Sequence, residues 1–215
     1  MSDLGGLFKS SEPIWQKFAD SINGSFIDNN KWAWGSIKFN VSNWVGVIDA
    51  PTLGGGYEYG QTFTRLRVPI LNESGFSFKI YQEGFVSTVG KVFGMQDIII
   101  EDKEFDDKFV IQSNDENKMK QIFNDMKLKS QILFANPMRV ELKIEPDRID
   151  HAMQGLINQY WPKEYGVFQI TMNGFIKDEI VLQDIFQTSR FFLLQMHKLN
   201  MISQEEQRFK FSCDY

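Results

Sequence analysis

Hydrophobic and polar residues along this chain follow two periods, and each period predicts a different kind of element. A period of two is clearest at residues 138–145, where Met138, Val140, Leu142 and Ile144 alternate with charged residues. Such alternation is typical of a strand with one buried face. Apolar residues spaced three or four apart predict amphipathic helices elsewhere. The predicted elements are an N-terminal helix over residues 11–23, a β-rich region over 35–112, a helix over 114–134, a strand over 138–145, a helix over 148–160, a strand over 167–173 and a C-terminal helix over 178–200.

The β-rich region contains short strands joined by short connections. Ile37, Phe39 and Val41 alternate with polar residues, and residues 44–49 follow after a turn that is short enough for a hairpin. Connections of this length favour antiparallel pairing, because parallel strands need a crossover of a dozen or more residues. The strand predicted at residues 61–70 has one face made of Thr64, Leu66, Val68 and Ile70, and a second face made of Phe63, Arg65 and Arg67.

Capping signals mark the starts of two helices. Ser113 and Glu116 have the spacing of a capping box, in which each side chain satisfies a backbone amide of the first turn. Asp178 is expected to cap the C-terminal helix, which is apolar almost all round near its middle and should be largely buried. The pattern of residues 84–94 predicts a further short helix between glycines.

From all of these elements we expect one α+β domain over residues 1–215, with a mainly antiparallel sheet, helices packed on one face and a long C-terminal helix.

Composition agrees with a folded domain and excludes some classes of function. Hydrophobic residues make up 42% of the 215 residues, and 20 phenylalanines supply material for a large core. The net charge of -5 argues against a protein that binds nucleic acid by neutralising phosphates. The densest group of lysines fits the solvated side of one helix and consists of Lys118, Lys120, Lys127 and Lys129.

Neither a membrane segment nor a disulfide is expected. The most apolar window, residues 180–202, is interrupted by Asp184, Arg190 and Lys198, so it is unsuited to spanning a bilayer. The first residues lack both the basic and the apolar part of a signal peptide. Cys213 is the only cysteine, which leaves neither a disulfide framework nor a thiolate metal site. These features predict a cytoplasmic protein.

Three motifs contain residue types that could support chemistry, and none of them matches the full pattern of a known site. Asp102, Glu104 and Asp106 match the first ligand positions of a calcium loop, but Asp107 and Ser113 replace its glycine and its bidentate glutamate. The glycine run at residues 54–56 lacks the Lys-Ser/Thr of a phosphate-binding loop. The two histidines, His151 and His197, have no metal-binding partner at the right spacing. The sequence therefore predicts no catalytic residue, no metal ligand and no cofactor.

Arg65 and Arg67 are the candidate binding residues. Lying two positions apart on one strand, they share a face with Phe63, so their guanidinium groups could together hold a carboxylate or a phosphate. The favoured alternative is cross-strand pairing with an aspartate or glutamate, or exposure to solvent at a sheet edge.

Four short strings in this order resemble an uncharacterised bacterial family that is commonest in the Bacteroidetes. They are Thr64–Arg67, Gly94–Asp97, Glu104–Ile111 and Gly174–Asp178, and the resemblance covers roughly residues 30 to 200. It implies a bacterial cytoplasmic protein. The family has no established activity, so the resemblance supplies no catalytic residue.

Three hypotheses about function follow from these patterns. The first is a non-catalytic module that binds a protein partner or a second copy of itself, or supports an assembly. The second is a carrier of a small molecule or lipid, with a cavity lined by phenylalanine. The third is an enzyme with an unrecognised site made of arginine and carboxylate groups.

Overall fold

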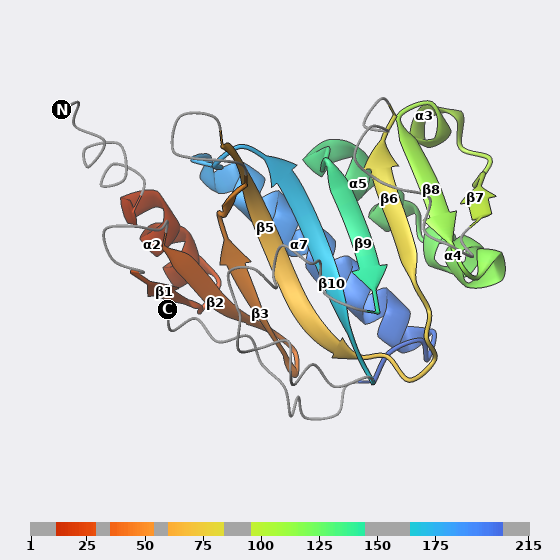
Figure 1. Cartoon of the computed structure of the whole chain (residues 1–215), viewed down its shortest axis with the longest axis horizontal. Helices are drawn as coiled ribbons and strands as arrows, with labels where there is room; N and C mark the ends of the chain where they lie inside the picture. The colour runs from red at the N-terminus through yellow and green to blue at the C-terminus, as the bar shows by residue number, and fades with distance from the viewer. Residues whose placement is uncertain (1–11, 29–34, 54–59, 84–95, 145–163, 204–215) are drawn as a thin grey trace.

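The computed structural model describes residues 12–28, 35–53, 60–83, 96–144 and 164–203, and it shows an α+β fold (Figure 1). The strands are β1 (Ser25–Ile27), β2 (Ser36–Val41), β3 (Trp44–Asp49), β4 (Thr52–Leu53), β5 (Gln61–Leu71), β6 (Phe78–Gln82), β7 (Gln96–Ile98), β8 (Phe109–Ser113), β9 (Arg139–Lys143) and β10 (Tyr165–Asn173). The helices are α2 (Glu12–Ser21), α3 (Lys103–Asp106), α4 (Glu116–Phe123), α5 (Met126–Ala135) and α7 (Glu179–Lys198).

One antiparallel sheet organises the described residues. Its strand order is β1-β2-β3-β5-β10-β9-β6-β8-β7, and β4 pairs with β5. The predicted hairpin is present, because β2 and β3 pair through the Val41–Trp44 turn. The centre of the sheet is built differently from a row of hairpins. There β10 lies between β5 and β9, so that residues about 100 positions apart in the sequence become neighbours.

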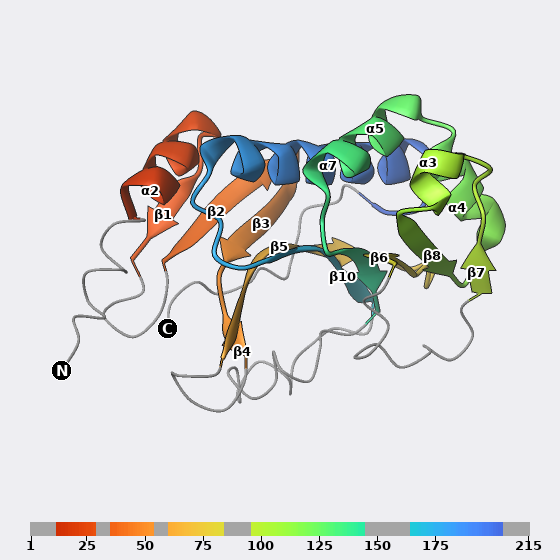
Figure 2. The same cartoon turned by 90° about the horizontal axis from the view of Figure 1, so that it is seen from above.

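The described helices all cover one face of the sheet, as Figure 2 shows. The long helix α7 runs across this face, and its Phe192 stacks on Phe78 of β6 and lies against Phe168 of β10. The apolar face predicted for β5 also points into this core, where Leu66, Val68 and Ile70 are buried. Burial of so many aromatic and aliphatic side chains is the main favourable contribution to the stability of the fold.

The predicted helix over residues 114–134 is wrong as a single element. It is divided into α4 and α5, because Asp125 has an extended backbone and its side chain accepts a hydrogen bond from the amide of Lys127. The capping box is also a wrong prediction. Asp115 caps α4 by accepting from the amide of Lys118, whereas the hydroxyl of Ser113 donates to the Ser77 carbonyl oxygen at 2.9 Å. A carboxylate one residue from the helix thus replaces the predicted serine cap.

Other boundaries differ by a few residues. The acidic turn contains the one-turn helix α3, β9 ends at Lys143, and β10 begins at Tyr165. Asp178 caps α7 as predicted, accepting from the amide of Ile180 at 2.8 Å. Several predictions lie outside the described residues: the helix over residues 148–160, the short helix over 84–94, the glycine run at 54–56, His151 and Cys213. Among the helices that the structure describes, none is long and apolar enough to cross a membrane.

Candidate functional site

The candidate site lies on the face of the sheet that carries no described helix, and we call it the polar face. Side chains alternate between the two faces of a strand, so the residues between the core positions of β3, β5, β6, β9 and β10 point to this side. Figure 2 shows β4 projecting away from the helices on the same side. On these five strands the charged residues of the polar face are Asp49, Arg65, Arg67, Lys79, Arg139, Glu141 and Lys143, and Gln169 and Thr171 lie among them.

The strand register aligns four of these residues in one row across the sheet. Arg67 of β5 lies opposite Gln169 of β10, Gln169 lies opposite Glu141 of β9, and Glu141 lies opposite Lys79 of β6. Neighbouring strands are about 4.8 Å apart, so the row extends about 14 Å. All four residues are buried, although charged and amide side chains normally point into water.

Asp49 joins the two predicted arginines. Arg65 binds it with two parallel hydrogen bonds, from Nε to Oδ1 and from Nη2 to Oδ2, each 3.0 Å long. Arg67 donates to the same Oδ2 from Nη2, and its exposed fraction is only 2%. The structure thus brings Arg65 and Arg67 together, in the arrangement expected from cross-strand pairing with an acid. Such forked, charge-assisted hydrogen bonds are strong and geometrically specific.

The titration of Asp49 reflects this pairing. Burial raises the pKa of its carboxyl group, but the charges of Arg67 and Arg65, and their hydrogen bonds, lower it further than burial raises it. The net result is a pKa below the ordinary value of 3.8, so Asp49 is ionised at neutral pH.

Tyr81 of β6, which lies opposite Arg139, also titrates away from its ordinary value. Burial, and then the charge of Asp97, raise the pKa of its hydroxyl group above 10.0.

Glu141 and Gln169 are adjacent buried acceptors at the centre of the row. Glu141 Oε1 lies 3.2 Å from Arg139 Nε and 3.6 Å from Lys143 Nζ. These are ion-pair contacts without hydrogen-bond geometry, and among the described residues this oxygen accepts no hydrogen bond. Gln169 donates through Nε2 to Thr171 Oγ1 at 3.0 Å, while its own Oε1 accepts none from any described residue. A buried acceptor without a donor costs about 1–3 kcal/mol.

Charge on the polar face has the opposite sign to that of the whole chain. Its five cationic residues and two carboxylates give 5 − 2 = +3, whereas the protein carries -5. Sequence reasoning identified Arg65 and Arg67 but missed the other members. The alternation of Arg139, Glu141 and Lys143 with apolar residues was visible in the sequence. A polar face on a strand normally indicates exposure to solvent, so nothing in the sequence indicated that these residues are buried.

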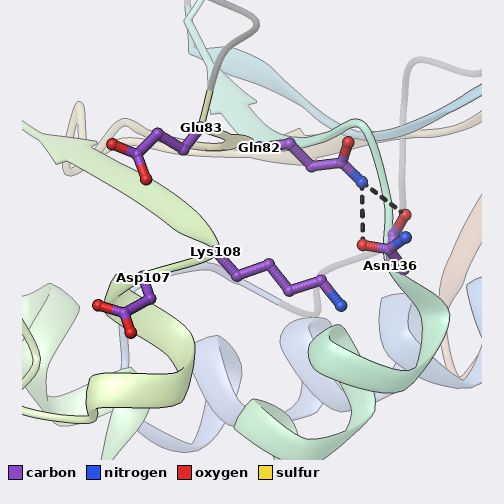
Figure 3. Close-up of a pocket in the computed structure, with 5 residues that line it drawn as sticks. All are labelled: Gln82, Glu83, Asp107, Lys108 and Asn136. Carbon is purple, nitrogen blue, oxygen red and sulfur yellow. Dashed lines mark hydrogen bonds between the residues drawn. The ribbon is translucent and has the colours of Figure 1, made fainter.

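A hollow of about 490 Å³ lies where β6, the α3–β8 turn and the α5–β9 turn meet. It is lined by Gln82, Glu83, Asp107, Lys108 and Asn136 (Figure 3). Gln82 Nε2 donates to both the backbone and the side-chain oxygen of Asn136, at 3.1 and 2.9 Å. Lys108 Nζ donates to the Leu133 carbonyl oxygen at 3.2 Å. These contacts hold the turns together, and they give the hollow a structural role.

The acidic turn uses its carboxylates to hold its own backbone. Asp102 caps α3 and pairs with Lys129 at 3.0 Å, and Asp106 accepts hydrogen bonds from the amides of Ile100 and Asp102. No cluster of three or more metal-ligating side chains occurs in the part of the chain that the structure describes.

The described histidine, His197, lies far from this turn in the sequence. Its ring packs edge-on against Trp44, and its Nδ1 lies 3.4 Å from the Ile202 carbonyl oxygen.

Comparison with known proteins gives a fold and no family. No family model matches this chain, and no curated protein matches it. Among solved structures, it is similar to the mycobacterial trehalose monomycolate transport factor A, TtfA. The TM-score is 0.54 and the identity 7%, over 87% of this chain and 95% of that chain. At this identity the likeness shows a shared fold, and the resemblance to a Bacteroidetes family stays a prediction.

Proposed function

We propose that this protein is a non-catalytic binding protein that holds a small polar or amphiphilic ligand on its polar face. The observation that carries this proposal is the pair of buried acceptors, Glu141 Oε1 and Gln169 Oε1, which receive no hydrogen bond from the described residues. Their side chains belong to residues only 5% and 1% exposed. Because buried polar atoms are nearly always hydrogen-bonded, a ligand that supplies donors accounts for both.

The state of Asp49 favours binding over catalysis. A general base works best with a pKa near the operating pH, whereas the pKa of Asp49 is lowered by its two arginine partners. Arg65 and Arg67 therefore orient and neutralise a carboxylate of the protein itself. This pairing argues against the hypothesis of an enzyme with an arginine and carboxylate site.

A carrier role gains support from the fold and from the apolar residues beside the row. TtfA, which shares the fold, is named a transport factor. Val47 and Val167 are buried together on the polar face, next to Arg67 and Gln169, and could contact the apolar part of an amphiphile. The described core phenylalanines pack against one another on the opposite face, so we place the ligand on the polar face instead of in a phenylalanine-lined cavity.

Native mass spectrometry of the protein purified from cells tests this proposal. We expect an additional mass that is lost on denaturation, and we expect Gln169→Met to reduce its occupancy strongly, since this variant removes the amide but keeps the side-chain length. Lys103→Gln is the matched control, because Lys103 lies on the exposed surface of α3. A bare polypeptide mass, together with no saturable binding in a screen of small polar molecules and lipids, would count against a carrier.

A second candidate function, docking to another copy of this chain, is favoured by helix α5. Met126 and Phe134 are 66% and 70% exposed on its solvent side, which is unusual for such large apolar residues. Sedimentation equilibrium across a concentration series measures this association. A dimer in the wild type that Phe134→Asp abolishes would support docking through α5, whereas a monomer at all concentrations would exclude it.

A further inference from the structure

We infer that the ligand of the polar face is an uncharged compound with neighbouring hydroxyl groups, as a sugar has. This inference rests on the binding function proposed above and names the chemical class of the ligand of the same site. It follows from the charges of the face, which already have partners, and from the mixture of donors and acceptors that the buried side chains present.

The cationic groups of the polar face already have partners. The two arginines of β5 contact Asp49, and Arg139 and Lys143 both contact Glu141. Lys79 has an interaction of its own as well. An anionic ligand would therefore compete with these partners for the same groups, and its binding would leave buried carboxylates without their cations.

The central row of the face is balanced in charge. It continues beyond Lys79, because Lys79 lies opposite Gln112 of β8, and Gln112 lies opposite Asp97 of β7. With Arg67 and Glu141, the row holds two cations and two carboxylates, which gives 2 − 2 = 0. Glu141 Oε1 already lies 3.2 and 3.6 Å from two cationic nitrogens, so both would repel a cationic ligand. These facts favour an uncharged ligand.

The hydroxyl groups follow from the hydrogen bonds that Glu141, Gln169 and Thr171 can still make. Glu141 Oε1 and Gln169 Oε1 need donors. Gln169 Nε2 gives one of its two hydrogens to Thr171 Oγ1. Its other hydrogen and the hydroxyl hydrogen of Thr171 have no acceptor among the described residues. An N–H group only donates, whereas a hydroxyl group donates and accepts, so hydroxyl groups match this mixture.

The two acceptors are placed for neighbouring hydroxyl groups. Glu141 and Gln169 lie directly opposite each other, and the side chains of such a pair begin about 5 Å apart. Hydroxyl groups on adjacent carbon atoms are close enough to reach both oxygens at once. Both residues are buried, so these hydroxyl groups must belong to a small molecule and not to the surface of a macromolecule.

A free sugar and the sugar headgroup of a glycolipid share this chemistry. Val167 lies two positions before Gln169 on β10, and therefore on the same face, where it packs with Val47. These two side chains would contact the alkyl part of a glycolipid. Both sources are arms of the experiment.

Titration calorimetry with neutral and charged probes tests the inference. The neutral probes are glucose, galactose and mannose, and the charged probes are inorganic phosphate and ethanolamine. We expect saturable binding of at least one sugar and of neither charged probe. Gln169→Met should weaken the bound sugar about tenfold or more, because it removes a buried hydrogen-bonding group. Lys103→Gln, on the exposed surface of α3, should leave the affinity unchanged.

Deoxy analogues of the bound sugar show whether its hydroxyl groups meet Gln169. We expect one analogue to bind the wild type about tenfold more weakly than the parent sugar, and to bind Gln169→Met as well as the parent does, since the partner of the missing hydroxyl is already gone. If Gln169 had only a structural role, the difference between parent and analogue would persist in the variant. Circular dichroism confirms folding, and Thr171→Val takes the place of Gln169→Met in both measurements if the latter is unfolded.

Methyl and octyl glycosides of the bound sugar distinguish the two sources. Tighter binding of the octyl glycoside, below its micelle-forming concentration, would identify a glycolipid headgroup, and equal affinities would identify a free sugar. Failure of all three sugars to bind would overturn the inference. Binding of phosphate or ethanolamine that depends on Gln169 would overturn it too, while leaving the binding function intact. Only a bare polypeptide mass in native mass spectrometry, together with no binding of any probe, would count against both.

Discussion

Replacing Asp49 with asparagine is expected to lower the free energy of unfolding by about 3 kcal/mol at neutral pH. Arg67 is only 2% exposed, so the variant would remove the carboxylate that its buried guanidinium group contacts. Arg65 would lose its two-bond contact as well. Asparagine keeps the size of the side chain, so the change isolates the charge. Urea denaturation followed by circular dichroism measures the difference from the wild type.

The pH dependence of this difference has a defined sign. Since the folded-state pKa of Asp49 lies below 3.8, its ionised form stabilises the fold fully above that value. The stabilisation is lost as the pH falls from 3.8 through the folded-state pKa, because the unfolded chain takes up the proton first. The wild type and Asp49→Asn should therefore approach each other in stability below about pH 4.

Lys17→Ala is the control for this prediction. It also removes one partner of an ion pair, but Lys17 is 72% exposed where it meets Glu179 at 2.7 Å. Exposed pairs contribute little, so we expect a change within about 0.5 kcal/mol. If Asp49→Asn were as mild as Lys17→Ala, the Asp49 cluster would have no structural importance.

Replacing Phe192 with alanine is expected to destabilise the protein by about 4 kcal/mol. The Phe192 ring is fully buried and contacts Phe78 and Phe168 at centroid distances of 5.5 and 5.4 Å. Its removal leaves a cavity between α7 and the centre of the sheet, in addition to losing apolar burial. For a protein of this size the melting temperature should fall by about 10 °C, as calorimetry would show.

Ile180→Ala on the same helix provides the comparison. Ile180 is 68% exposed at the start of α7, so its truncation opens no cavity and should change the melting temperature by no more than about 2 °C. Similar losses in both variants would mean that α7 does not depend on the packing of Phe192 against the sheet.

The elements of the fold could be predicted where local patterns decide them. Alternation in β5 assigned Leu66, Val68 and Ile70 to the core face, and the position of Asp178 located the start of α7. The break between α4 and α5 was missed, because the apolar stripe continues through it and hides the cap at Asp125. The choice between Ser113 and Asp115 as the cap of α4 likewise depends on a hydrogen bond from Ser113 to Ser77, which precedes β6 and lies 36 residues away in the sequence.

The candidate site was predicted only in its first two members. Arg65 and Arg67 were recognised because they lie two positions apart on one strand. Their partner Asp49 belongs to β3, and Glu141 and Gln169 belong to strands separated from β5 by about 70 and 100 residues. Pairing over such distances leaves no trace in a single sequence, since strand order depends on the packing of the whole sheet.

By itself, the sequence determined which side chains share a face of each element, because the periods of strands and helices are properties of the local backbone. It therefore specified an antiparallel sheet with helices on one side. Only the tertiary structure decided that β10 lies between β5 and β9, and that the charged half of these strands is buried instead of solvated. Burial and charge balance are set by neighbours in space, and for the polar face those neighbours come from five strands spread over most of the chain.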